Sequence, residues 1–365
     1  MGRPETLRRL SFRALPSLRE ETEKWEREYL SPFACLSSES RGRLTPEKPC
    51  FIRTEFQRDR DRIVYSNAFR RLKHKTQVFL SPLGDHYRTR LTHTLEVSEI
   101  ARTMARALRL NEDLAEAIAM GHDLGHTPFG HGGEVVIKEI YSDAFSHPEQ
   151  SVRVVDVLEN HGQGLNLTFE VRDGILKHSK GYGAVLLEQS NEMPVTVEGR
   201  IVRFADIMGY LNHDLDDAIR SGVIHLGQIP KPCTEVLGHC HSERVRCMIT
   251  DLVKSTQIED GEMHLAMSQS VSEAMGMLRQ FLYENVYRSV QVHGEFLKAK
   301  KILSELYYYF LEKPKALEEE LKKMEMGNFP PGTTQERKVC DFVASMTDRY
   351  ALNLYEEIFL PKPLV

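Results

Sequence analysis

A nearly all-apolar helix that ends in a histidine and an aspartate most constrains how this chain can fold. Residues 111–123 read NEDLAEAIAMGHD. Asn111 suits the N-cap, the two acids after it suit the first turn, and the apolar residues that follow cover most sides of the helix. We therefore expect this helix to lie buried at the centre of a domain. A carboxylate buried at its end, as in Asp123, needs a charged partner or a metal ion.

Helical spacing of apolar residues continues along most of the chain from about residue 55. Short helices are predicted around Ile63–Leu72 and over Leu95–Leu108, with Thr92 as an N-cap. Further predicted helices cover 17–29, 148–160, 168–178, 197–221, 243–255, 267–290, 294–311, 314–325 and 334–358. Only 223–230 (VIHLGQIP) has the character of a short strand. The sequence therefore predicts an all-α fold.

The organisation of the chain follows from its breakers and its length. Five prolines among the first 50 residues favour an N-terminal arm over 1–50. We expect a helical core over 51–225 and a helical C-terminal part over 226–365 packed on it. No apolar stretch approaches the roughly 18 residues of a membrane span, and the N-terminus lacks the apolar core of a signal peptide. Six cysteines without a CxxC pair favour a reduced, cytoplasmic chain.

Positive charge is concentrated in one segment of an otherwise acidic protein. The net charge is −5, yet residues 53–90 hold ten Lys/Arg against four acidic residues. Such a segment favours an anionic partner, either phosphate groups or nucleic acid. A solvated helix face explains the same composition, and composition alone leaves both readings open.

Histidines and aspartates at defined positions indicate a metal site. His93 lies near the start of the helix that precedes the buried one, and His122-Asp123 ends the buried one. Two antiparallel helices joined by a tight turn would bring these ends together. Asp206, on another apolar helix, is the candidate fourth ligand. Mixed nitrogen and oxygen donors suit divalent Mn, Fe, Co or Zn, and also tolerate Mg.

The pattern H…HD…D resembles the HD superfamily of metal-dependent phosphohydrolases. The motif GHDLGHTPFGHGGE (121–134) is similar to the signature of the deoxynucleoside triphosphate triphosphohydrolases, the dGTPase family. The likeness covers about 53–290, and CDFVASMTDRYALNLYEEIF (340–359) also resembles bacterial members. The resemblance implies an HD-domain helical fold with an extended helical C-terminal part.

The resemblance also implies roles for individual residues. The metal ligands would be His93, His122, Asp123 and Asp206. The catalytic group would be His131, oriented by Glu134, with His126 contacting the phosphates. The residues that bind substrate would be Arg71, Gln77, Arg90, His147, Tyr210, Asp214, Arg279 and Tyr287. Arg71 and Arg90 would bind phosphate. Gln77, Tyr210 and Asp214 would contact the deoxyribose. Asp206, Tyr210 and Asp214 are spaced by four residues, so one helix face presents all three.

The implied reaction is metal-dependent hydrolysis of a deoxynucleoside triphosphate to deoxynucleoside and inorganic triphosphate. The resemblance also implies a homo-oligomer such as a hexamer, and allows a single-stranded DNA partner; no membrane partner is expected. Ile207 departs from the pattern, because some relatives have a phosphate-binding lysine there. Two alternatives remain: another HD phosphohydrolase, either a nucleotidase or a cyclic-dinucleotide phosphodiesterase, and a catalytically silent regulatory protein that binds nucleotide or single-stranded DNA.

Several conspicuous residues are given structural roles. His161, His178 and His213 have no motif behind them and are interpreted as surface or structural residues. The run Tyr307–Tyr309 is interpreted as a helix-packing face, and Met346–Arg349 as part of an internal packing network.

Overall fold

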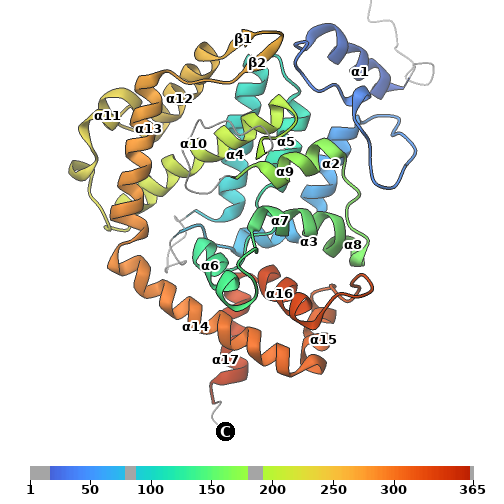
Figure 1. The fold of residues 1–365 in the computed structure, drawn as a ribbon, viewed down its shortest axis with the longest axis vertical. Coiled ribbons are helices and arrows are strands. Elements are labelled where there is room, and N and C mark those ends of the chain that lie inside the picture. The colour runs from blue at the N-terminus through green and yellow to red at the C-terminus, as the bar shows by residue number, and fades with distance from the viewer. Residues whose placement is uncertain (1–16, 79–87, 180–191, 362–365) are drawn as a thin grey trace, which may run out of the picture.

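The computed structural model describes residues 17–78, 88–179 and 192–361, and within these ranges the chain is helical apart from one two-stranded hairpin (Figure 1). The first half contains α1 (Leu18–Tyr29), α2 (Glu55–Tyr65), α3 (Asn67–Arg71), α4 (Arg90–Ala107), α5 (Glu112–Gly121), α6 (Gly130–Ile140), α7 (His147–Arg153), α8 (Glu159–Gly162) and α9 (Phe169–Lys177). The second half contains α10 (Val197–Arg220), α11 (Lys231–Leu237), α12 (His241–Ser255), β1 (Gln257–Glu259), β2 (Glu262–His264), α13 (Gln269–Leu282), α14 (Val290–Glu312), α15 (Pro314–Lys323), α16 (Gln335–Ser345) and α17 (Asp348–Phe359). The predicted all-α class is confirmed.

Helix α5 is the central element, as its sequence predicts. It packs against α2, α4, α9 and α10, and its apolar residues are buried. The Asn111 side chain caps it by accepting a hydrogen bond from the backbone N–H of Leu114 at 3.2 Å. The chain turns immediately after α5, and His122 and Asp123 lie buried at this end of the helix.

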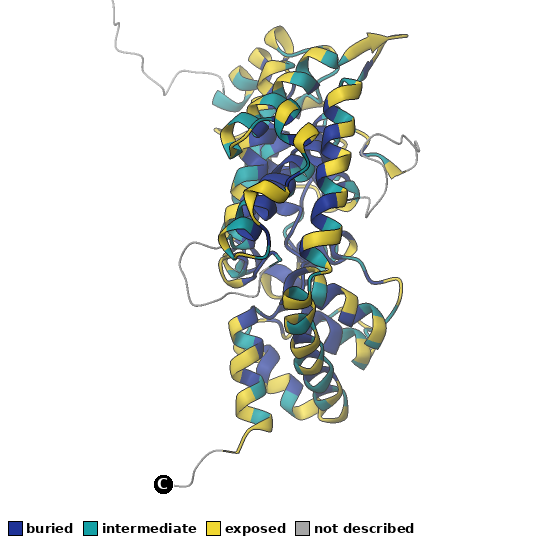
Figure 2. Cartoon of the chain, turned by 90° about the vertical axis from the view of Figure 1, so that its left-hand side faces the viewer, coloured by how far each residue is buried: buried dark blue, intermediate teal, exposed yellow. Residues whose placement is uncertain are grey.

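The C-terminal helices pack on the segment that follows α5. Helix α14 contacts α6, α15, α16 and α17, and these helices lie together at one end of the molecule (Figure 1). Buried residues form one continuous core from Phe56 to Leu354, visible in Figure 2 as dark blue along the inner faces of the helices. The division of the chain at residue 225 stays a prediction.

Two buried ionic residues connect α16 and α17 to the turn after α5. Asp348 accepts hydrogen bonds from the backbone N–H and hydroxyl of Thr76, at 3.1 and 2.5 Å, and from the N–H of Phe129 at 2.9 Å. Lys75 donates to the carbonyl oxygens of His126 and Ala344. Burial raises the pKa of Asp348 and holds that of Lys75 well below its usual value. This is the packing network expected around Met346–Arg349.

The expected strand at 223–230 is wrong, because a 3₁₀ turn occupies Leu226–Gln228. The hairpin lies instead at β1 and β2, where Asp260 and Gly261 both have positive φ and form its tight turn.

Two predicted helices are shorter than expected. The helix predicted over 334–358 is two helices, because the backbone of Met346 is extended and Thr347 caps α17. The helix predicted over 148–160 ends in a π-helical turn at Leu158, and Asn160 and His161 have left-handed backbone angles.

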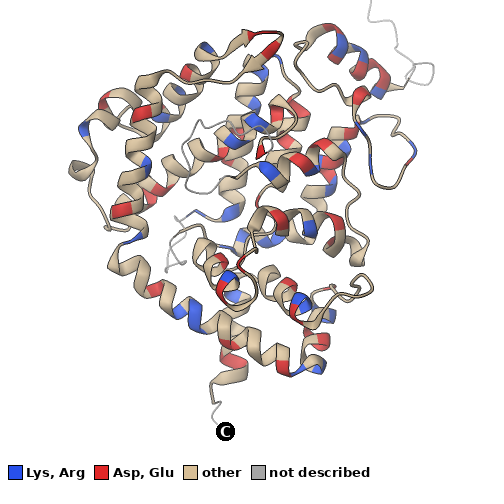
Figure 3. Cartoon of the chain, viewed as in Figure 1, with Lys and Arg blue, Asp and Glu red and all other residues tan. Residues whose placement is uncertain are grey.

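Most arginines of the basic segment pair with acidic side chains of the protein. Arg53 contacts Asp61 at 2.6 Å, Arg58 contacts Glu47 at 2.6 Å, and Arg60 contacts Glu116 at 3.0 Å. Figure 3 shows acidic and basic residues intermingled along these helices. These arginines therefore mostly neutralise acidic side chains of the protein itself. None of the described helices combines the length and the apolar character needed to cross a bilayer.

Candidate active site

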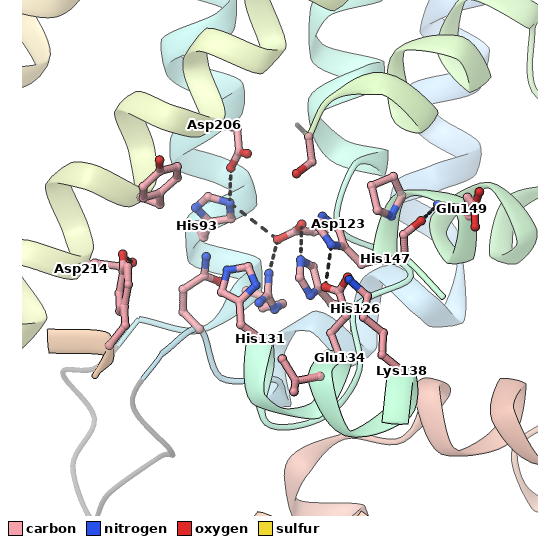
Figure 4. A pocket seen from close by; sticks show the side chains of 18 of the residues that line it. His93, Asp123, His126, His131, Glu134, Lys138, His147, Glu149, Asp206 and Asp214 are labelled. Atoms are coloured by element: carbon pink, nitrogen blue, oxygen red, sulfur yellow. Dashed lines mark hydrogen bonds and ion pairs between the residues drawn. The ribbon is translucent and has the colours of Figure 1, made fainter. Parts of the chain in front are cut away.

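A cavity of about 570 Å³ opens beside the end of α5 (Figure 4). Thirteen of the fifteen residues predicted for the site line it: Gln77, Arg90, His93, Asp123, His126, His131, Glu134, His147, Asp206, Tyr210, Asp214, Arg279 and Tyr287. His122 lies directly behind this wall, with its Nε2 3.3 Å from Asp123 Oδ1. Helices α4, α6, α7, α10 and α13 thus converge on one chamber.

The four predicted metal ligands come together at one point of the wall. His93, His122 and Asp123 are buried, and one ligand atom from each lies within 4.8 Å of the others. Asp206 Oδ1 lies 3.2 Å from His93 Nε2 and 3.9 Å from His122 Nε2. The ligands derive from α4, the end of α5 and α10, so the helix packing itself assembles the cluster.

The Nε2 atoms of the two histidines face each other at the cluster. His122 Nδ1 donates to the carbonyl of Ala119 at 2.6 Å, and His93 Nδ1 lies 2.8 Å from His213 Nε2. The two Nε2 atoms are 3.3 Å apart. The Nε2 lone pair of His122 lies 3.3 Å from Asp123 Oδ1 and 3.9 Å from Asp206 Oδ1, an electron-rich arrangement that a cation would stabilise. The donor set therefore fits a divalent ion with mixed nitrogen and oxygen ligands.

Both carboxylates of the cluster are held in the charged form. Burial alone would raise the pKa of Asp123, but His122, His126 and Arg90 hold it well below its usual value. Burial likewise opposes ionisation of Asp206, and the hydrogen bond from His93 and the nearby His122 outweigh it and lower its pKa.

Three buried polar groups on the cavity wall lack hydrogen-bond partners among the described residues. The guanidinium of Arg90 is 1% exposed and uses Nη1 on Asp123, at 2.7 Å, while its Nε and Nη2 have no partner. Oε1 of Gln77 and Nδ1 of His126 are also unpartnered. A buried polar group without a partner is costly, so these atoms indicate a polar ligand, and the two free donor nitrogens of Arg90 favour an anionic group on it.

His131 projects from the first turn of α6 and is exposed to the open space of the cavity. Its ring packs against those of His126 and His147, with centroids 5.5 and 6.4 Å away. Desolvation by the cavity walls lowers its pKa, followed by the charge of Arg90, while the charge of Glu134 opposes the shift.

Glu134 was expected to orient His131, and the structure shows a different partner. Its Oε2 lies 2.9 Å from Nδ1 of His147, and Oε1 lies 3.3 Å from Lys138. Within the described residues, Glu134 acts on His131 through charge and not through a hydrogen bond. Burial would raise the pKa of Glu134, but His147 outweighs burial and lowers it.

Two of the three residues predicted to read the sugar line the cavity from α10, and the third, Gln77, lines it from the segment before α4. Tyr210 and Asp214 follow Asp206 along one face of α10. The hydroxyl of Tyr287, from the turn after α13, donates to Asp214 Oδ2 at 2.6 Å. Arg279, from α13, and Tyr287, from the turn after it, also line the cavity.

Arg71 and Ile207 do not line the cavity. Arg71 donates instead to Glu159 at 3.2 Å, and burial lowers its pKa. Its predicted contact with phosphate stays a prediction. Ile207, which replaces a lysine of some relatives, packs against the core. Lys138, which lines the cavity, is a cation on this wall that sequence reasoning missed.

Two histidines interpreted as surface or structural residues are buried directly behind the site. His178 Nε2 lies 3.1 Å from His147 Nε2, and His213 contacts His93. Each is held by tertiary packing, and no local pattern around either residue signals this position.

Comparisons with known proteins agree with this geometry. An HD domain model matches residues 90–210, and a model of a phosphohydrolase-associated domain matches residues 265–357. A protein of Desulfatibacillum aliphaticivorans named deoxyguanosinetriphosphate triphosphohydrolase-like protein is 60% identical, over 96% of this chain and 100% of the relative. Relatives of the same name from Caldanaerobacter subterraneus subsp. tengcongensis and Clostridium perfringens are 51% and 45% identical, over 95% and 94% of this chain and 97% and 98% of theirs.

Proposed function

The chain belongs to the deoxyguanosinetriphosphate triphosphohydrolase-like proteins, which are hydrolases of HD type, and from this premise we propose that it hydrolyses deoxynucleoside triphosphates to deoxynucleoside and inorganic triphosphate. The observation that carries the proposal is a cluster of His93, His122 and Asp123, with Asp206 Oδ1 3.2 Å from His93 Nε2, beside the partly unsatisfied guanidinium of Arg90. Tyr210 and Asp214 line the same chamber from α10.

Arg90 is the phosphate-binding group in this proposal. Its unpartnered Nε and Nη2 present two N–H donors of one planar guanidinium, and such a pair matches two oxygens of a phosphate. Because Arg90 also contacts Asp123 at 2.7 Å, it holds the bound phosphate next to the metal cluster. Lys138 and Arg279 add positive charge along the same cavity.

His93, His122, Asp123 and Asp206 would hold the divalent cation. The cation supplies Lewis acidity, which activates water and neutralises charge on the α-phosphate. This assignment is supported by the packing of α4, α5 and α10, which brings His93, His122 and Asp123 together with Asp206 Oδ1 3.2 Å from His93 Nε2. The ligand set suits Mn, Mg, Fe, Co or Zn.

His131 is the group that donates a proton to the departing 5′-oxygen of the nucleoside. It is exposed to the cavity, and no hydrogen bond within the described residues restrains its ring. Burial lowers its pKa in the free protein. A bound triphosphate brings negative charge beside it and favours the protonated form, so His131 becomes a competent acid when substrate is present.

Selection for deoxyribose follows from the wall made by Tyr210, Asp214 and Tyr287. An added 2′-hydroxyl there would be forced against a packed wall or left without a partner, which costs roughly 1–3 kcal/mol. We expect hydrolysis of dNTPs to exceed that of rNTPs by about ten- to a hundred-fold. Equal rates of dNTP and rNTP hydrolysis at equal concentration would show that these residues do not select the sugar.

The test compares two aspartates of the same helix. Asp206→Ala removes a proposed ligand, whereas Asp216→Ala changes a residue paired with His241 and Arg244 outside the cavity. The purified variants are assayed for bound metal and for release of triphosphate from each of the four dNTPs. We expect Asp206→Ala to lose metal and activity together, and Asp216→Ala to keep both. Wild-type metal content and turnover in Asp206→Ala would refute the proposal.

A cytoplasmic location, a homo-oligomeric state such as a hexamer, and binding of single-stranded DNA remain proposals. The first is supported by six cysteines that are all free thiols. Light scattering of the purified protein, with and without a dNTP or a single-stranded oligonucleotide, tests the other two.

A further inference from the structure

A line of buried side chains connects the metal cluster to the sugar-facing wall of the cavity. His93 Nδ1 lies 2.8 Å from His213 Nε2, His213 Nδ1 lies 2.9 Å from Asp214 Oδ1, and Tyr287 donates to Asp214 Oδ2 at 2.6 Å. His93 is 1%, His213 0% and Asp214 3% exposed, so bulk water does not compete for these contacts. The line joins α4, α10 and the turn after α13.

Hydrogen-bond chemistry gives this line a direction. A neutral imidazole carries one N–H and one lone pair. If His93 offers its Nε2 lone pair to a metal, its proton must be on Nδ1 and must be donated to Nε2 of His213. His213 then carries its own proton on Nδ1, which lies 2.9 Å from the Asp214 carboxylate without the geometry of a hydrogen bond, so this contact is electrostatic. Asp214 is held from the other side by the hydroxyl of Tyr287.

We propose that His213 is a positioning residue that couples the metal cluster to the residues that recognise the sugar. It fixes the ring and tautomer of His93 on one side and the carboxylate of Asp214 on the other. A correctly seated sugar, which contacts Asp214 and Tyr287, then also stabilises the geometry of the metal ligand. The inference rests on the proposed function only for the identity of the sugar; its effect on the metal does not require a nucleotide.

The residues around His213 make a purely space-filling role a poor explanation. Its ring meets His93 edge to face, with centroids 4.9 Å apart, and its two nitrogens lie 2.8 Å from His93 Nδ1 and 2.9 Å from Asp214 Oδ1. A hydrophobic residue of similar volume would fill this position in a helix as buried as α10 without leaving polar groups to satisfy. The polar ring is therefore explained by the groups that it connects.

The experiment measures metal affinity in the absence of nucleotide and substrate selectivity separately. Calorimetric titration with Mn²⁺ is carried out on the wild type, His213→Leu, Tyr287→Phe and the double variant. His264→Leu, on β2 and outside the cavity, is the control for histidine replacement. We expect His213→Leu to lower Mn²⁺ affinity about 10- to 100-fold, the usual effect of losing the partner of a ligating histidine. Tyr287→Phe, which touches no metal ligand in the line, should lower it by a smaller factor.

The double variant distinguishes coupling from independent damage. If the effect of Tyr287 reaches the metal through His213, the double variant binds Mn²⁺ as His213→Leu alone does. His213→Leu should also reduce the ratio of kcat/KM for a dNTP over the matching rNTP. Unchanged Mn²⁺ affinity in His213→Leu, or independent effects that multiply in the double variant, would overturn the coupling.

Failure of the coupling and failure of the proposed function give different results. A wild-type protein that binds Mn²⁺ but hydrolyses no dNTP refutes the proposed function, while the titrations still decide the role of His213. A wild-type protein that hydrolyses dNTPs, with a His213→Leu variant that keeps Mn²⁺ affinity and sugar selectivity, refutes the coupling alone.

Discussion

Replacing Asp348 by alanine should destabilise the protein and slow catalysis at a site formed by other helices. The carboxylate accepts three hydrogen bonds, two from Thr76 and one from the N–H of Phe129, and all three donors are buried. Phe129 and Gly130 both have positive φ, and they lead directly into His131 on α6. Loss of the carboxylate therefore frees the turn that sets the position of His131.

The expected magnitude follows from the groups left without an acceptor. Two buried N–H groups lose their partner, at roughly 1–3 kcal/mol each. Burial of Asp348 is itself unfavourable, as its raised pKa shows, and its removal offsets part of that loss. We expect the free energy of unfolding to fall by about 2–4 kcal/mol, and kcat to fall because His131 is less well placed.

Urea unfolding and single-turnover hydrolysis measure the two effects. Asp348→Asn keeps one acceptor oxygen and should lie between wild type and Asp348→Ala. Glu336→Ala, in the exposed first turn of α16, controls for loss of an acidic residue at a helix N-terminus and should change neither quantity appreciably. Wild-type stability and turnover in Asp348→Ala would refute the reasoning.

Two further predictions concern the proton donor and the pH dependence of stability. His131→Ala should lower turnover by about 10²–10⁴ while calorimetry shows little change in binding of a non-hydrolysable dNTP; lost binding with retained turnover would make His131 a phosphate ligand. Burial raises the pKa of Glu198, which accepts the N–H groups of Cys35 and Asn111, to about 7. The folded state then retains a proton that the unfolded chain releases near pH 4.5, so stability falls by about 3 kcal/mol as pH rises from about 4.5 to about 7. Glu198→Gln should remove this decline in urea unfolding at about pH 5 and pH 8, and an identical decline in the variant would contradict the assignment.

The central helix could be predicted from the sequence because its signals are local: the apolar run before His122 and the Asn111 cap belong to one helix. The 121–134 motif runs from the end of α5 into α6, and the resemblance that it carries implied most residues lining the cavity. The face of α10 that carries Asp206 and Tyr210 could be derived from helical spacing alone.

The residues behind the site could not be predicted because their roles depend on tertiary contacts. His213 meets His93, which is 120 residues away, and Asp348 meets Phe129, which is 219 residues away. The break at Met346 carries no proline or glycine, so the apolar spacing continues through it and predicts one helix. The hairpin at Asp260-Gly261 has a recognisable turn dipeptide, but its strands of three residues each are too short to show alternation.

The fate of labelled water tests the central claim most directly. The wild-type protein is incubated with a dNTP and Mn²⁺ in ¹⁸O-labelled water, and the products are separated and analysed by mass spectrometry. Attack at the α-phosphorus with release of the 5′-oxygen predicts unlabelled deoxynucleoside and inorganic triphosphate that carries one ¹⁸O. Release of deoxynucleoside monophosphate and pyrophosphate, or of diphosphate and phosphate, would contradict the account.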